Sequence, residues 1–242
     1  MHDRLTMAPL PAPAELHGLV LMLHGGAERG DAPVDHRSLA LRRTGAMFRA
    51  ISGDLAEHGA ATALLRFSVK GWQAKPAGSD ATDADSTSGR TPSPVADARL
   101  AIRDLHTAHP DLPIVLLGHS MGARTAAWVA DEPGVVGVVG LAPWFPTDDP
   151  VEALAGKHLV AAHGRRDRIT SARATRRFVE RAQEVAAEAR FVDMGGVGHY
   201  MLRGIGAWNR VALTETVCLL DRAVARPEPD VRSVTPQECN QH

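Results

Sequence analysis

The chain has 242 residues, of which 44% are hydrophobic, 4% aromatic and 23% charged, and its formal net charge is −1 at pH 7. These values are typical of a water-soluble globular protein, and the length suits one large α/β domain or two small ones. The near-zero net charge and the scarcity of aromatic residues argue against a nucleic-acid-binding surface.

Short apolar runs alternate with helical patterns along most of the chain. The predicted strands cover residues 19–23, 61–67, 114–117, 135–141, 159–162 and 190–194. The predicted helices cover residues 47–58, 95–107, 123–130, 172–187 and 207–225. Unbroken apolar runs indicate strands that are buried on both faces. Their alternation with helices predicts an α/β fold, with a mostly parallel, doubly wound sheet and helices on both faces.

Three segments fall outside this alternation. We expect residues 1–16 to form an N-terminal extension and residues 17–225 to form a single domain. Within it, residues 70–94 are rich in Ser, Thr, Asp, Gly and Pro, and predict a long surface loop. Residues 226–242 are polar and contain three prolines, which predicts a disordered tail.

Targeting and redox signals are weak. Residues 1–15 contain no continuous apolar core of the kind found in signal peptides, and no apolar stretch is long enough to cross a membrane. The two cysteines, Cys218 and Cys239, form no disulfide framework, although a single disulfide is possible. We therefore expect a cytoplasmic protein with no membrane partner.

The sequence Gly118-His119-Ser120-Met121-Gly122 lies between a predicted strand and a predicted helix. In that context Gly-x-Ser-x-Gly predicts a nucleophile elbow, a sharp turn that lifts the serine hydroxyl off the sheet. Glycine is expected at both positions, because a Cβ there would keep the helix and a neighbouring strand from approaching closely. The pentapeptide alone is a weak motif, because a glycine-rich chain can contain it by chance. Ser120 could also be an ordinary helix N-cap.

A catalytic serine needs a histidine base, and the base needs a carboxylate that orients it. Asp167 follows the predicted strand 159–162, and His199 follows the predicted strand 190–194. Both lie just past the carboxyl ends of parallel strands, where open α/β sheets build their sites. The chain order Ser120, Asp167, His199 is also the order of the α/β-hydrolases.

From about residue 19 to about residue 225, the sequence resembles a serine hydrolase of the α/β-hydrolase superfamily. The motifs that carry the resemblance are His24-Gly25-Gly26, Gly118-His119-Ser120-Met121-Gly122, His163-Gly164-Arg165-Arg166-Asp167 and Gly198-His199. The resemblance implies that Ser120 is the nucleophile, Asp167 the acid and His199 the base.

It also implies an oxyanion hole made of two backbone amides. One belongs to Met121, the residue after the nucleophile. The other comes from the loop after the first central strand, here Gly26, with Ala27 as the next candidate. Such donors each contribute a few kcal/mol to stabilisation of the transition state.

Many members of the superfamily insert a cap domain between the strands predicted here at 135–141 and 159–162. Only residues 142–158 lie in that interval, so we expect no large cap domain. The chain is thus similar to compact members, such as the dienelactone-hydrolase-like and small esterase groups. It differs from dienelactone hydrolases proper, whose nucleophile is cysteine. Trp144 and Phe145 are candidates for an apolar substrate pocket, or simply cover the core.

Other residues compete for these roles. Asp148 and Asp149 are rival acids, because some family members carry the acid after the preceding strand. Asp167 is preferred since it alone fits the His-Gly-x-x-Asp spacing. Three further histidines are expected to be hydrogen-bonded or packing groups rather than catalysts, namely His24, His119 and His163.

The sequence therefore predicts a serine hydrolase that cleaves an ester, thioester or related acyl bond of a small-molecule substrate through an acyl-enzyme. No metal or organic cofactor is expected. Two alternatives stay open, namely a non-catalytic ligand-binding protein of the same fold, and an enzyme with the same three residues but peptidase or perhydrolase chemistry. The sequence does not indicate the natural substrate or the oligomeric state.

Overall fold

A computed structural model of the protein describes residues 3–10, 15–73 and 91–225. Its centre is a seven-stranded sheet in the order β1-β4-β2-β6-β7-β8-β9. The strands are β1 (Leu5–Met7), β2 (Gly18–Leu23), β4 (Ala60–Leu65), β6 (Ile114–His119), β7 (Val135–Leu141), β8 (His158–His163) and β9 (Glu188–Asp193). Only β1 is antiparallel to its neighbour, which confirms the predicted mostly parallel sheet.

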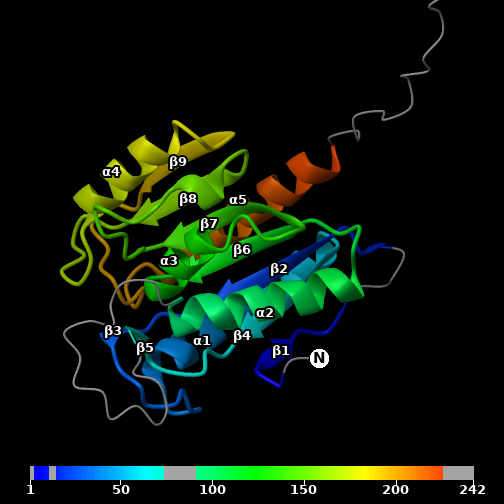
Figure 1. Ribbon diagram of the computed structural model, residues 1–242, viewed down its shortest axis with the longest axis horizontal. Coiled ribbons are helices and arrows are strands. Elements are labelled where there is room, and N and C mark those ends of the chain that lie inside the picture. Colours follow the sequence, from blue (N-terminus) through cyan, green and yellow to red (C-terminus); the bar gives the residue numbers. More distant parts are fainter. Residues whose placement is uncertain (1–2, 11–14, 74–90, 226–242) are drawn as a thin grey trace, which may run out of the picture.

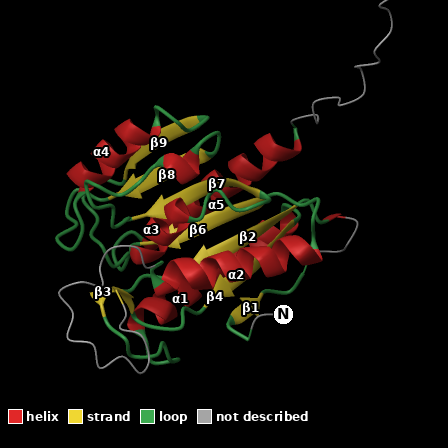
Figure 2. Cartoon of the chain, viewed as in Figure 1, coloured by secondary structure: helices red, strands yellow, loops and turns green. Residues whose placement is uncertain are grey.

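Helices cover both faces of the sheet (Figure 1) and alternate with the strands along the chain (Figure 2). The first face carries α1 (Leu39–Glu57) and α5 (Ile205–Val224), and the second carries α2 (Ser93–Ala108), α3 (Met121–Trp128) and α4 (Ala172–Ala182). One apolar cluster fills each of the two layers between the sheet and its helices. β2, β4 and β6 are buried at every residue, which explains their unbroken apolar sequences.

The structure corrects the predicted boundaries in two places. The segment 1–16 is not merely an extension, because it contains β1, which pairs with β4 at the edge of the sheet. The predicted loop 70–94 begins with β5 (Gly71–Gln73) and ends in the first turn of α2. β5 pairs in parallel with β3 (Ala27–Arg29) in a separate two-stranded sheet. Residues 74–90 of that loop and the predicted tail, which includes Cys239, lie outside the described residues.

No cap domain lies between β7 and β8, as predicted. The interval contains only the short 3₁₀ turn η2 (Glu152–Leu154). The carboxyl ends of the central strands therefore meet loops rather than an inserted domain. No helix in the described part of the chain is long and apolar enough to span a membrane.

Candidate active site

Ser120 lies on the sharp turn between β6 and α3. Its backbone has φ 55° and ψ −116°, a conformation that residues other than glycine rarely adopt. The loop after β7 holds the turn on both sides. The Ser120 amide donates to the carbonyl of Leu141 over 3.0 Å, and the Ser120 carbonyl accepts from the amide of Trp144 over 3.2 Å. The turn places the hydroxyl at the N-terminus of α3, where developing negative charge is favoured.

The two glycines of the pentapeptide allow close packing of the backbone. A Cβ on Gly118 would lie 2.5 Å from the Cα of Ala123, in the first turn of α3. A Cβ on Gly122 would overlap the carbonyl oxygen of Leu23, at the end of β2. Both obstacles are backbone atoms, which cannot move aside as a flexible side chain would. These contacts agree with the steric reason that the sequence suggests.

We predict that Gly122→Ala lowers the free energy of unfolding by about 1–3 kcal/mol, because the methyl group forces β2 and α3 apart. Gly53→Ala is the matched control, since a Cβ at that position in α1 meets nothing within 4 Å. It should raise stability by up to about 1 kcal/mol through helix propensity. Urea unfolding of the two variants measures both effects. An unchanged midpoint for Gly122→Ala would show that the close approach is not required.

The structure brings Ser120, His199 and Asp167 together in one hydrogen-bonded line. The Ser120 Oγ lies 3.0 Å from Nε2 of His199, and Nδ1 of His199 lies 2.8 Å from Oδ2 of Asp167. Ser120 and His199 are each 6% exposed, and the Asp167 side chain is 1% exposed. Because Nδ1–H donates to the carboxylate, Nε2 is left to accept the serine proton. The residues follow β6, β8 and β9, so the parallel sheet delivers them to one edge.

The Asp167 carboxylate is held by a dense set of donors. Its Oδ1 accepts from the amides of Ile169 (2.8 Å) and Thr170 (2.9 Å). Its Oδ2 accepts from the Thr170 hydroxyl (3.0 Å) and from Nε2–H of His163 (3.1 Å), besides His199. Burial works to raise the pKa of this carboxyl, but the hydrogen bonds from His163, His199 and the two amides lower it well below its usual range. Asp167 therefore stays ionised and keeps its orientation.

The sequence predicted the role of one of these donors, His163, but not that of the other, Thr170. His163 is the hydrogen-bonded structural group that we expected, because its Nδ1 also accepts from the Thr175 hydroxyl at 2.9 Å. Thr170 was missed. Its hydroxyl lies 3.1 Å from Nδ1 of His199 as well as 3.0 Å from Asp167. The signal that could have revealed it is the Asp-x-x-Thr spacing, because an aspartate side chain commonly accepts hydrogen bonds from amides two and three residues later.

Neither rival acid contacts the histidine in the described structure. Asp149 is buried and forms two short hydrogen bonds with the guanidinium of Arg124, at 2.6 Å and 2.5 Å. The guanidinium also lies 4.0 Å from the ring centroid of Trp72. Asp148 is exposed. Arg124, one helical turn after Ser120, therefore holds Asp149 in a buried ion pair.

The two proposed pocket residues lie in different surroundings. Trp144 is half-buried, and the Arg124 guanidinium lies 4.4 Å from its ring centroid. Phe145 is 3% exposed and stacks on Phe178 at 3.9 Å, inside the apolar cluster under α4. Phe145 thus belongs to the core, and of the pair only Trp144 is exposed enough to line a pocket.

Gly26 and Met121, the residues whose amides are the oxyanion candidates, pack against each other. Met121 is the first residue of α3, so its amide has no partner within the helix. Its side chain packs on Gly26, where a Cβ would lie 2.6 Å from the Met121 sulfur and 2.6 Å from the carbonyl oxygen of Lys70. The amide of Ala27 already donates to Lys70 over 2.8 Å. This bond holds the loop through β3 and β5, and it leaves Gly26 as the better candidate of the two. His24, as expected, is structural and accepts from the amide of Phe67 at 3.1 Å.

His119 has a position that the sequence did not reveal. Its ring is buried, and its Nε2–H donates to the backbone carbonyl of His199 over 3.0 Å. Burial, and then the proximity of His199, lower the pKa of His119 to about 3. The ring is therefore neutral at physiological pH. We expected a packing residue, whereas the structure shows a side chain that also fixes the backbone of the candidate base.

We predict that His119→Leu lowers kcat for an ester substrate about tenfold with little change in KM, because His199 loses its backbone anchor. His119→Gln should retain most of the activity, since its amide nitrogen can donate to the same carbonyl. Steady-state kinetics on both variants tests this. Equal losses in the two variants would mean that the shape of the ring matters and that the hydrogen bond does not.

Within the described ranges, no three His, Cys, Asp or Glu side chains gather as candidate ligands of a metal ion.

Comparison by sequence finds limited similarity. A family model of serine aminopeptidases of the S33 type matches residues 77–162. This stretch contains Ser120 but neither Asp167 nor His199. No curated protein matches the chain in sequence.

Comparison of structures finds similar folds over nearly the whole chain. Esterase 2 from Thermogutta terrifontis, solved with propionate bound, has a TM-score of 0.64 at 17% identity and covers 93% of this chain and 91% of its own. A serine hydrolase without a lid from Xanthomonas campestris has a TM-score of 0.60 at 19% identity, with coverage of 92% and 91%. Est1E from Butyrivibrio proteoclasticus, solved with ferulic acid, has a TM-score of 0.57 at 15% identity, with coverage of 90% and 96%.

Proposed function

We propose that this chain, which has the α/β-hydrolase fold without a lid and resembles serine hydrolases and esterases at low identity, cleaves carboxylic esters of small molecules through an acyl-enzyme. The observation that carries the proposal is the hydrogen-bonded line from Ser120 through His199 to Asp167, with distances of 3.0 Å and 2.8 Å. Each member follows a different strand, so the line is a product of the tertiary fold.

In the proposed mechanism the Ser120 Oγ attacks the ester carbonyl carbon while Nε2 of His199 takes the hydroxyl proton. The carbonyl π-electrons move to oxygen, and the amides of Gly26 and Met121 bind the resulting oxyanion. Asp167 accepts the Nδ1–H bond and stabilises the charged imidazole. When the C–O bond breaks, His199 gives its proton to the leaving alcohol. A water molecule then repeats the sequence on the acyl-enzyme and releases the acid.

One specific observation favours a second candidate, because the matching family model describes serine aminopeptidases. The amine of an amide is a poorer leaving group than the alcohol of an ester, and it needs the same proton from His199. Among the structural neighbours, the Thermogutta terrifontis esterase was solved with propionate and Est1E with ferulic acid. Those ligands are acids of the kind that ester cleavage releases, and we therefore rank ester hydrolysis first.

The test is covalent labelling with a fluorophosphonate probe, followed by mass spectrometry of the labelled peptide. We expect one label, on Ser120, and turnover of para-nitrophenyl butyrate. Comparison with the matching para-nitroanilide separates esterase from peptidase activity. Ligand binding without label or turnover would instead support a non-catalytic binding protein.

A further inference from the structure

Arg43, on α1, is a half-buried arginine that forms no ion pair with the described residues. Its guanidinium lies 5.4 Å from the ring centroid of Tyr200, and within the described part of the chain no carboxylate forms an ion pair with it. By contrast, Arg99 is paired with Glu132 and Arg124 with Asp149. Burial lowers the pKa of the Arg43 guanidinium below its usual value, while the Tyr200 phenol acts in the opposite direction. A cation that is partly removed from water in this way is a site where an anion would be stabilised.

Arg43 lies beside the candidate base. The Tyr200 ring meets the His199 ring edge-on at 5.5 Å, so the guanidinium and the imidazole flank the same aromatic ring. The charge of Arg43 also helps to lower the pKa of His119, which underlies His199. In the proposed mechanism His199 protonates the leaving group. If the leaving group departs beside His199, Arg43 lies on the same side as that group.

The surface around Arg43 suits an apolar group that carries one charge. Tyr200, whose ring faces Arg43, is 54% exposed, although its ring is large and mostly apolar. Leu39, 75% exposed, lies one helical turn before Arg43 and therefore on the same side of α1. An aromatic or aliphatic leaving group could cover these side chains while its charged end meets the guanidinium.

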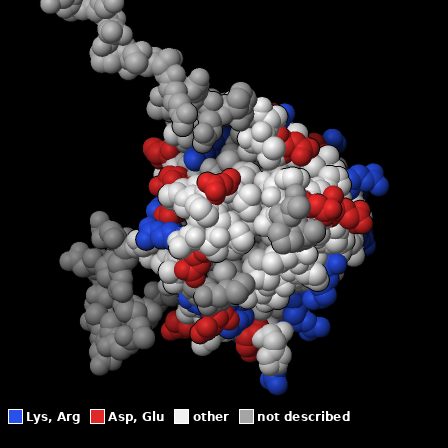
Figure 3. Space-filling view, turned by 90° about the vertical axis from the view of Figure 1, so that its right-hand side faces the viewer, with Lys and Arg blue, Asp and Glu red and all other residues white. Residues whose placement is uncertain are grey.

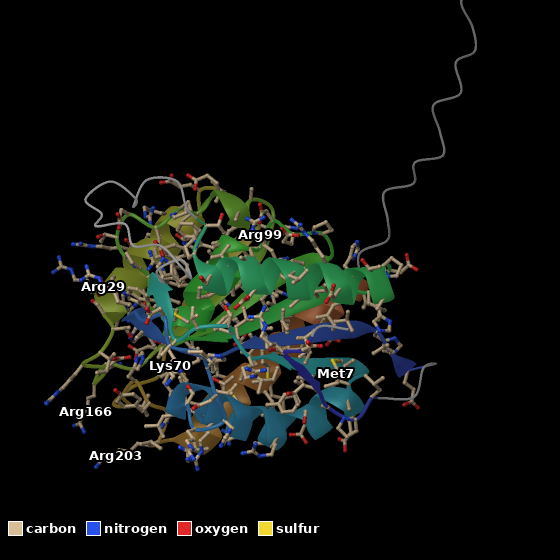
Figure 4. All side chains as sticks on the ribbon, turned by 60° about the horizontal axis from the view of Figure 1, so that its bottom comes forward. Met7, Arg29, Lys70, Arg99, Arg166 and Arg203 are labelled. Atoms are coloured by element: carbon tan, nitrogen blue, oxygen red, sulfur yellow. The ribbon has the colours of Figure 1, made fainter. Side chains whose placement is uncertain are left out.

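Charges of both signs lie at this end of the molecule, where Glu28 and Asp31 are exposed beside Arg29. Figure 4 shows Arg29, Lys70, Arg166 and Arg203 at the end where the central strands have their carboxyl ends. Figure 3 shows the opposite end, where acidic and basic side chains are mixed. Because both signs are present, any preference for an anionic substrate has to come from local contact with Arg43 and not from the long-range field.

We propose that Arg43 binds a carboxylate on the leaving group, so that the preferred substrates are esters whose alcohol or phenol carries a carboxylate. This inference rests on the proposed ester hydrolysis at Ser120. One guanidinium carries one positive charge and two parallel N–H donors, which match a carboxylate in both charge and geometry. Arg43 thereby selects the substrate and takes no part in bond cleavage.

The test compares para-carboxyphenyl acetate with para-carbamoylphenyl acetate, which has nearly the same shape and no charge. We expect Arg43→Gln to lower kcat/KM about tenfold for the carboxylate ester and to leave the amide-bearing ester within about twofold. Arg43→Lys should recover part of the loss. Arg42→Gln is the matched control, because it removes the same charge from the neighbouring exposed position. It should change the two substrates equally.

The outcomes separate this inference from the proposed function. If both esters are hydrolysed but Arg43→Gln affects them equally, or if Arg42→Gln has the same selective effect, the Arg43 assignment is wrong while ester hydrolysis stands. If neither ester is hydrolysed and no fluorophosphonate label forms, the proposed function is wrong. Binding of para-hydroxybenzoate and para-hydroxybenzamide by calorimetry then still decides the assignment. The Arg43 assignment predicts that para-hydroxybenzoate binds more tightly than para-hydroxybenzamide, and that Arg43→Gln loses this preference.

Discussion

Replacing Ser120 with alanine should lower kcat for para-nitrophenyl butyrate at least about 1,000-fold and abolish labelling by a fluorophosphonate. The substitution removes the attacking oxygen and leaves His199 and Asp167 hydrogen-bonded to each other at 2.8 Å. Rate that survives such a change in serine hydrolases comes from substrate binding and the oxyanion amides alone. Stopped assays at high enzyme concentration, with the label read by mass spectrometry, measure the loss.

The fold should survive this substitution, because among the described residues the Ser120 hydroxyl is hydrogen-bonded to His199 alone. Circular dichroism and the urea midpoint check this point. Ser52→Ala, in the middle of α1, is the matched control and should retain full activity. Wild-type turnover by the Ser120 variant would rule out an acyl-enzyme on this residue, whatever the fold.

The second large effect is expected for Asp167→Asn, with a fall in kcat of about 10³–10⁴-fold. The side chain keeps its shape but loses the charge that stabilises protonated His199, and its amide group favours the wrong tautomer of the imidazole. The carboxylate also accepts from Ile169, Thr170 and His163, so the variant leaves several donors poorly matched. Part of the loss should appear as a lower urea midpoint.

Asp149→Asn provides the contrast, because Asp149 is the rival acid in the sequence. It should destabilise the fold by about 1–3 kcal/mol, since it weakens the buried pair with Arg124. Below the unfolding temperature, its kcat should stay within a few-fold of wild type. The opposite result, an inactive Asp149 variant and an active Asp167 variant, would transfer the role of the acid to Asp149.

The amino-acid sequence was sufficient for the α/β fold class and for the main strands and helices. It was sufficient because buried parallel strands must be apolar along their whole length, as β2, β4 and β6 are. It also located the turn at Ser120, since local sterics exclude a Cβ at Gly118 and Gly122. Chain order and strand ends then placed Asp167 and His199 at the same edge.

The three-residue strands could be identified only from the tertiary structure. β1, β3 and β5 contain no apolar run, and each exists only because a partner strand accepts its hydrogen bonds. Their sequences therefore resemble those of loops. These short strands matter for the candidate active site, because β3 and β5 hold the Gly26 loop against Met121.

The choice between carboxylates and the supporting contacts were also decided by long-range packing. Arg124 captures Asp149, and Thr170 shares its hydroxyl between Asp167 and His199. His119 reaches a carbonyl 80 residues away in the chain, and Arg43 on α1 meets Tyr200 in the turn between β9 and α5. Local propensity carries no information on such pairs, since the residues become neighbours only when the sheet and its two helical layers assemble.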